Sequence, residues 1–180
     1  MAGFCAYIMS SLPALQFDDK PALSYGRFVE ACRGFVDDEV VRTLEMIGSG
    51  GIYGGKAENP VLRRWLDFEV PLRDELVKIR SSRKHVDPEK YIRGSGQADM
   101  SVSRIAMNAH RSRSILESEG LLDRARWDKL DELEAGHYLD LDNVIVYALK
   151  LLISVKRQNA KDADRPAVLE AALSGGENSL

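Results

Sequence analysis

The sequence predicts an all-α fold, a multi-helix domain with one nearly fully buried central helix. The first indication is the stretch from Leu139 to Arg157, LDLDNVIVYALKLLISVKR, in which only Lys150 and Ser154 interrupt the apolar run that starts at residue 144. A helix that is apolar on almost every side has to be buried on almost every side. This one is too short, and too charged at both ends, to span a bilayer. The second indication is that most other segments repeat apolar residues at helical spacing, between glycines and prolines that punctuate the chain.

The composition limits the class of protein. The chain has 180 residues, of which 44% are hydrophobic and 29% charged, as is typical of a globular protein with a real core. We expect one helical domain over residues 1–163, then a short helix and a flexible tail over residues 164–180. The formal charge of −3 gives no reason to expect nucleic acid or an anionic membrane as a partner. Cys5 and Cys32 are too few for a disulfide framework, and the N-terminus lacks the basic start of a signal peptide. We therefore expect a cytoplasmic protein, or one on the cytoplasmic side of something larger.

The N-terminal third alternates short apolar runs with turn signals. Residues 4–12, FCAYIMSSL, fit a strand or a buried extended segment, because the periodicity of so short a run does not decide between them. Ser24 is expected to cap a helix that reaches about Val36. Asp37 is expected to cap the next helix, which ends at Gly48.

The middle of the chain contains one clear helix start. Asn59 followed by Pro60 combines a capping residue with a first-turn proline. Pro71 is expected to start, kink or divide the helical segment that follows, because proline lacks the N–H that the helix interior needs. Gly94 and Gly96 then predict a loop.

The last third is helical again. The pattern resumes at about Asp99, and residues 121–133, LLDRARWDKLDEL, keep helical spacing up to the stop at Gly136. The central helix follows, and beyond it Pro166 permits one more short helix. The predicted core contains Trp65, Trp127, Tyr147, Leu151 and Leu152.

The glycine-rich stretch from Gly50 to Lys56 matches the first seven positions of a phosphate-binding loop, GxxxxGK. Ala57 stands where that motif places the Mg²⁺-binding Ser or Thr. The preceding segment is predicted to be a helix, where the motif requires a strand, and Pro60 follows closely. We therefore favour a linker between helices, with a nucleotide-binding protein as the alternative.

No stretch spells out a complete catalytic motif, so we expect neither an enzyme nor a bound cofactor or metal ion. The three histidines, His85, His110 and His137, lack the spacing of metal ligands on one helix. Asp140 and Asp142 are suited to acid–base chemistry, but both also stand where a carboxylate caps the central helix and favours its N-terminus. Capping explains them more simply.

Two groups of basic residues are candidates for binding. The first lies between Lys78 and Arg93, and the second consists of Arg104, Arg111 and Arg113. A nucleic-acid-binding module is one interpretation of the first group, but apart from Tyr91 it lacks interleaved aromatic residues for stacking on bases. A solvated face or a docking surface for an acidic protein partner fits both groups better. From charge alone, the candidate docking residues are Lys78, Arg80, Arg83, Lys84, Arg104, Arg111 and Arg113.

Two further stretches carry a pattern of their own. Residues 7–24, YIMSSLPALQFDDKPALS, contain SLP followed by DDKP. Residues 119–157 contain Trp127, His137, Tyr138, Asp140, Tyr147, Lys150, Leu151 and Arg157 in the order W…H-Y/F-x-D…Y-x-x-K-L…R. The first stretch lies within roughly the first fifth of the chain, and the second falls largely within the last third. In this combination they resemble the bacterial V-type ATPase C-subunit-like family.

The resemblance implies a fold similar to that of the all-helical C (or d) subunit of rotary ATPases. That subunit is a non-catalytic adaptor, which caps the membrane rotor ring and receives the central shaft. The expected partners are therefore other V-type ATPase subunits of the central stalk and rotor ring, with no nucleic acid. The expected role lies in ATP-driven ion transport, such as proton transport. The expected location is the cytoplasmic face of the inner membrane, reached only through the complex.

Overall fold

The chain folds into helices throughout the part that the structure describes. A computed structural model describes residues 2–54 and 57–175, and no strand occurs in these residues. The α-helices are α1 (Ala2–Ser11), α2 (Tyr25–Cys32), α3 (Asp38–Ser49), α4 (Pro60–Lys84), α5 (Met100–His110), α6 (Ile115–Glu134) and α7 (Leu141–Gly175). Two short 3-10 helices, η1 (Gly51–Gly54) and η2 (Pro88–Lys90), lie in the connections. The predicted all-α fold class is confirmed.

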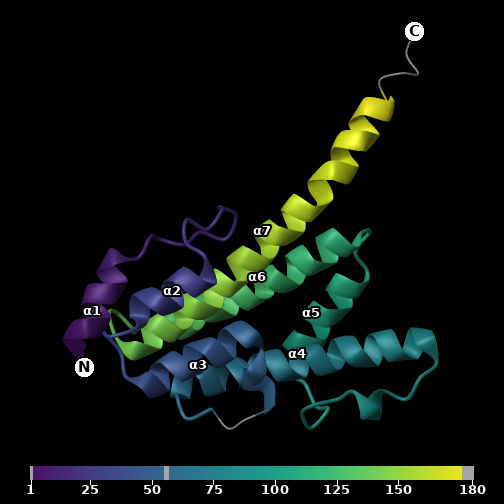
Figure 1. Ribbon diagram of the computed structural model, residues 1–180. Helices are drawn as coiled ribbons and strands as arrows, with labels where there is room; N and C mark the ends of the chain where they lie inside the picture. The colour runs from purple at the N-terminus through teal and green to yellow at the C-terminus, as the bar shows by residue number, and fades with distance from the viewer. Residues whose placement is uncertain (1, 55–56, 176–180) are drawn as a thin grey trace.

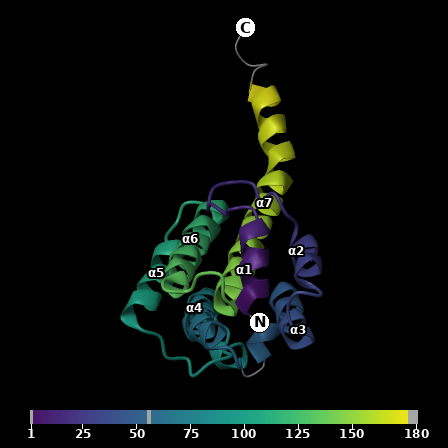
Figure 2. The same cartoon turned by 90° about the vertical axis from the view of Figure 1, so that its left-hand side faces the viewer.

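Helix α7 is the spine of the molecule. It packs against α1, α2, α3, α4 and α6, and every residue from Asn143 to Leu151 is buried. Figure 2 shows α2 and α3 on one side of α7, and α4, α5 and α6 on the other. Of the predicted core, Trp65, Trp127, Tyr147 and Leu151 are buried, whereas Leu152 is only half-buried at the edge of the core.

A second, smaller core lies away from α7. It joins the second half of α4 to α5 and to the first half of α6, through Leu72, Leu76, Val102, Ala106, Ala109 and Leu122. Figure 1 shows α5, the end of α4 and the start of α6 at the end of the body opposite α1. The molecule therefore has one end built around α7 and another built around α4.

Side-chain caps fix several helix starts where the sequence predicted them. Ser24 Oγ accepts the N–H of Arg27 at the start of α2, and Asn59 Oδ1 accepts the N–H of Leu62 at the start of α4. Asp140 Oδ1 accepts the N–H of Asn143, so this carboxylate caps α7. These bonds satisfy N–H groups that have no partner inside their own helix.

The expectation that residues 4–12 form a strand or a buried extended segment is wrong, because these residues lie mostly within α1. Cys5 and Ile8, three residues apart, are the buried positions through which α1 packs against the core around α7. Helix α2 stops at Cys32, short of the predicted Val36, and α3 runs one residue past Gly48 before Gly50 ends it with a φ of 75°.

Neither inner proline breaks its helix. Helix α4 continues through Pro71, and α7 continues past Pro166 to Gly175 instead of restarting as a separate short helix. At Pro71, the carbonyl of Asp67 loses its N–H partner, but Asp67 lies on the exposed side of α4. Figure 1 shows the last turns of α7 extending well beyond the body.

Candidate docking surfaces

The first predicted basic group does not form one surface. Lys78 is half-buried: its ammonium donates to Glu75 Oε1 at 2.6 Å and to the carbonyl of Gly96. It therefore anchors the loop after η2 to α4 and is not free for a partner. Arg83 and Lys84, by contrast, are exposed at the last turn of α4, which is capped by His85 with a φ of 53°. We call this pair the α4 tip.

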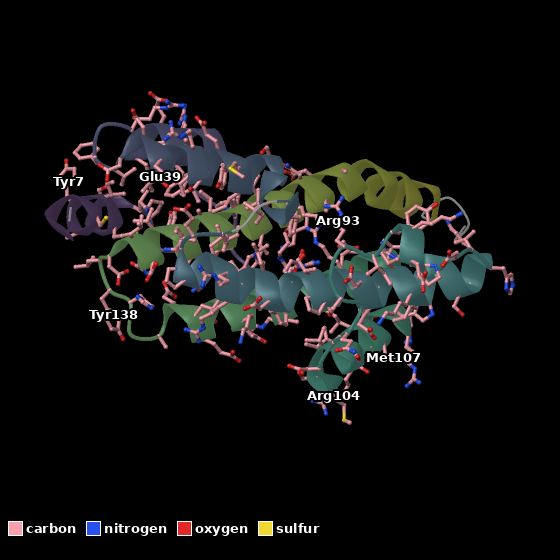
Figure 3. The ribbon with its side chains drawn as sticks, turned by 90° about the horizontal axis from the view of Figure 1, so that it is seen from below. Tyr7, Glu39, Arg93, Arg104, Met107 and Tyr138 are labelled. Atoms are coloured by element: carbon pink, nitrogen blue, oxygen red, sulfur yellow. The ribbon has the colours of Figure 1, made fainter. Side chains whose placement is uncertain are left out.

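The second predicted group lies on one exposed corner. Arg104 is on α5, and Arg111 and Arg113 are in the turn between α5 and α6; all three are exposed. The turn is fixed by reciprocal capping, because Ser114 Oγ accepts the N–H of Glu117 and Glu117 Oε2 accepts the N–H of Arg113. Figure 3 shows Arg104 projecting away from the body of the molecule.

Exposed apolar side chains lie beside these arginines, and the charge pattern of the sequence did not indicate them. Ile115 is 84% exposed, and Leu116 and Met107 are also exposed. We call the whole set, Arg104, Met107, Arg111, Arg113, Ile115 and Leu116, the α5–α6 corner. Apolar residues surrounded by polar and charged ones are typical of protein interfaces. Helical position could have indicated that Met107 is exposed, because it does not share the α5 face that carries the buried Val102, Ala106 and Ala109.

The two stretches that resemble the C-subunit-like family pack against each other. The Tyr147 hydroxyl donates to the carbonyl of Pro13 at 2.9 Å, and Arg157 pairs with Asp18 at 3.1 Å. Phe17 meets the ring of Trp127 edge-on, with 5.5 Å between ring centroids. The loop after α1 is thereby held across α6 and α7.

Arg157 also lies over the ring of Phe17, 3.8 Å from its centroid, so one arginine makes both an ion pair and a cation–π contact with this loop. Tyr147 lies against Phe28. Burial, and to a smaller extent the neighbouring Cys32, raises the pKa of Tyr147 to about 12.

Other members of the pattern support the turn between α6 and α7. The buried Lys150 pairs with Asp131 Oδ1 at 2.6 Å and with Glu134, and lies over the ring of Trp127. His137 Nδ1 is 2.9 Å from Asp140 Oδ2 and 3.4 Å from Asp142 Oδ2. Within the described residues, this histidine and its two aspartates are the set whose ligand atoms lie close enough to share a metal ion.

Both aspartates beside His137 already accept hydrogen bonds from other groups. Asp140 caps α7 and Asp142 accepts from Asn59, the cap of α4. Burial alone would raise the pKa of Asp140, but hydrogen bonds from Asn143 N–H and His137 outweigh it and lower that pKa. Both aspartates lie at a helix N-terminus, where the helix dipole favours negative charge. The capping role expected for Asp140 is confirmed.

An ion-pair network joins α4 to α6, and no pattern in the sequence indicated it. Glu69 is 1% exposed and accepts from Arg73 at 2.7 Å and from Arg126 at 2.9 Å. Arg126 also pairs with Asp123 at 3.0 Å. Burial raises the pKa of Asp123, while Arg126 opposes that shift. Arg73 stacks on the ring of Tyr53, so η1 joins the same network.

The glycine-rich loop lies between helices. Helix α3 precedes it, Gly50 caps that helix, and η1 covers residues 51–54. Gly55 and Lys56 lie outside the described residues, so the structure says nothing of the lysine that the phosphate-binding motif needs. A phosphate-binding loop follows a strand, and no strand occurs in the described part of the chain.

None of the helices in residues 2–54 and 57–175 combines the length and apolar composition that crossing a membrane requires. Comparisons with family models, with curated proteins and with solved structures found no match to this chain. The family resemblance therefore rests only on the sequence pattern of the two packed stretches.

Proposed function

We propose that this chain is a non-catalytic adaptor of a bacterial V-type ATPase, which links the central stalk to the membrane rotor ring during ATP-driven ion transport. The observation that carries the proposal is that the two stretches resembling the C-subunit-like family, residues 7–24 and 119–157, pack against each other. If the two stretches belong to one family pattern, their residues are expected to contact each other in the fold. Residues that match the pattern by chance have no reason to do so.

An adaptor that transmits torque needs a part that does not yield. Helix α7 suits this task, because its first half is buried among five other helices and its second half continues in the same helix. Close-packed interiors resist compression, so a force on the outer half of α7 reaches the core directly. The chain itself performs no chemical step in this proposal and reaches the membrane only through its partners.

Two surfaces are suited to docking. The α4 tip offers exposed positive charge, which speeds and orients the approach of an acidic partner more than it strengthens the final complex. The α5–α6 corner offers exposed apolar side chains among arginines, which a partner can bury. Both surfaces lie at the end of the body opposite α1 (Figure 1), so one partner can cover both.

Purification of the V-type complex through an affinity tag on another of its subunits tests the proposal. Mass spectrometry should find this chain in the complex from its native cells, and deleting the chain should reduce coupled proton or sodium pumping. A complex that lacks the chain, together with unchanged pumping in the deletion strain, would contradict the proposal.

Charge reversal at the α4 tip tests the docking assignment separately. Arg83→Glu combined with Lys84→Glu should lower the amount of chain that co-purifies with the complex. Helical content should not change, because exposed charges contribute little to stability. The matched control is Arg27→Glu combined with Arg42→Glu, the same charge change at exposed positions of α2 and α3. Equal losses in both variants would show that net charge, and not the α4 tip, controls assembly.

A further inference from the structure

A basic cavity lies between α4, α6, α7 and the loop after η2, and neither docking surface includes it. Its volume is about 370 Å³. Five cationic side chains line it, namely Arg73, Arg80, Arg93, Arg126 and Lys156. Two carboxylates, those of Asp74 and Glu119, belong to the same lining. The cavity therefore gathers positive charge in a chain whose net charge is −3.

Two of the five cations, Arg73 and Arg126, belong to the ion-pair network between α4 and α6. Arg126 is held by Glu69 and Asp123, and Arg73 by Glu69 and Tyr53. Their charges are balanced by these carboxylates, so they shape the cavity more than they attract a ligand. Glu69, Arg73 and Arg126 are each bonded to two partners, which restrains this side of the cavity.

The other three cations, at the mouth, are poorly balanced. Arg80 lies 3.9 Å from Glu119 Oε1 and Lys156 lies 3.7 Å from Glu119 Oε2, so one carboxylate serves two cations at distances too long for good hydrogen bonds. The Arg93 side chain has no hydrogen-bond or ion-pair partner within the described residues. Figure 3 shows Arg93 between the ribbons of α4 and α7.

The loop that carries Arg93 is clamped to α4. Asp74 is 2% exposed, and its two carboxylate oxygens accept the N–H groups of Arg93 and Gly94, both at 2.9 Å. A Cβ atom at Gly94 would lie 2.9 Å from Asp74 Oδ2 and 2.9 Å from Val70 Cγ1, so only glycine allows the loop to come this close. Arg93 is therefore held at the cavity by a buried contact.

We propose that this cavity binds a small multivalent oxyanion of the phosphate class, held by Arg80, Arg93 and Lys156. These residues come from α4, the loop after η2 and α7, so three separate elements converge on one ligand. Guanidinium groups match the oxygens of a phosphate with paired hydrogen bonds, and a lysine adds a compact charge. Low-dielectric concave walls concentrate the field of such a cluster.

The lining of the cavity favours a small ion over an acidic protein segment. Leu76 and Leu122 belong to the lining but are buried, so apart from Tyr91 the mouth offers few exposed apolar residues on which a protein partner could anchor. The inference does not depend on the proposed role in an ATPase, because the ligand is a free ion and not another subunit.

Isothermal titration calorimetry of the full chain with inorganic pyrophosphate tests the proposal, with inorganic phosphate and sulfate as further probes. We expect one pyrophosphate per chain. Arg93→Gln and Lys156→Gln should each weaken binding about tenfold or more, the effect of losing a charge-assisted hydrogen bond. Both side chains are exposed, so both variants should keep the circular dichroism spectrum and urea midpoint of the wild type. Arg64→Gln and Arg42→Gln, at exposed positions that do not line the cavity, should bind as the wild type does.

Two results would overturn the assignment. The first is that pyrophosphate fails to bind the wild type, or binds equally well after Arg93→Gln and Lys156→Gln are combined. The second is that pyrophosphate binding does not depend on Arg93 and Lys156, whereas the binding of a polyglutamate peptide does. That second result would assign the cavity to an acidic protein segment.

Discussion

Glu69 carries its carboxylate into the interior, where Arg73 and Arg126 are the groups that balance it. Taking a charge out of water costs several kcal/mol, and the structure recovers that cost only if partners satisfy the buried oxygens. Because Glu69 lies on α4 and Arg126 on α6, this compensation links two elements. The loss of one partner therefore costs more than the loss of a surface ion pair.

Replacing Arg126 with methionine tests this link. The change keeps most of the side-chain volume but leaves Glu69 with one partner and Asp123 with none of its ion-pair bonds. The free energy of unfolding, from urea denaturation, should fall by about 3–5 kcal/mol. The control is Arg124→Met, two residues away and exposed, which should cost at most about 1 kcal/mol. Similar losses in both variants would show that burial of the network is not what matters.

Asp140 connects a single cap to the pH dependence of stability. Burial would raise its pKa, but the hydrogen bonds from Asn143 N–H and His137 outweigh burial and hold the folded-state pKa below the ordinary 3.8. A carboxyl group whose pKa is lower in the folded state stabilises the fold above the unfolded pKa. That stabilisation is lost as the pH falls through the folded pKa.

We therefore expect Asp140→Ala to lower the free energy of unfolding by about 1 kcal/mol at neutral pH, as the loss of a helix cap does. The difference from the wild type should shrink as the pH falls below 3.8, the ordinary pKa of the group. Urea denaturation at a series of pH values measures both effects. Asp37, the N-cap of α3, makes no side-chain cap hydrogen bond, so Asp37→Ala should show a smaller loss. A difference that stays constant down to acid pH would contradict this account.

At the scale of the elements, most of the other helices depend on α7 because they pack against it. Leu151 is fully buried, whereas its neighbour Leu152 lies at the edge of the core. Leu151→Asp should abolish cooperative thermal unfolding, because an unpaired charge in the core has no compensation. Circular dichroism melting measures this. Leu152→Asp should be less damaging, and Leu121→Asp, on the exposed face of α6, should melt as the wild type does.

Local chemistry made some of these elements predictable. The caps at Ser24 and Asn59 depend on the residue and the next three positions, so the sequence was sufficient. The run of residues 4–12 was misjudged because a short apolar run forms a helix or a strand according to what it packs against, here the core around α7. Helix α7 also runs through Pro166, although proline removes one backbone hydrogen bond from a helix interior, so this residue does not begin a separate helix.

The binding surfaces were predictable only in part. Charge along the sequence indicated Arg83 and Lys84, which are exposed, but it also indicated Lys78, which is engaged with Gly96. The convergence of Arg93 with Lys156 depends on the loop clamp and on the packing of α7, and no local pattern encodes either. Sequence spacing detects groups on one element and misses groups assembled from several.

At the scale of the whole molecule, the packed body and the projecting part of α7 should behave differently. Residues 159–163 are exposed, so a chain that ends at Ala163 should unfold with a free energy within about 0.5 kcal/mol of the full chain. A chain that ends at Lys156 additionally loses Arg157 and its contacts with Asp18 and Phe17, and should be clearly less stable. Urea denaturation of both truncations tests this. A large loss in the chain that ends at Ala163 would show that residues after 163 belong to the folded body.

The loop after α1 has its partners near the opposite end of the chain, since Pro13 bonds to Tyr147 and Asp18 to Arg157. A ribosome adds roughly 5–20 residues per second, so the first helices leave the exit tunnel seconds before α7 is made. During that interval the apolar faces of α1, α2 and α3 lack the helix that covers them in the finished fold. Long-range contacts of this kind also slow folding after release. A nascent chain stalled before residue 141 should therefore remain bound to chaperones and open to proteases, and should become resistant only once α7 has emerged.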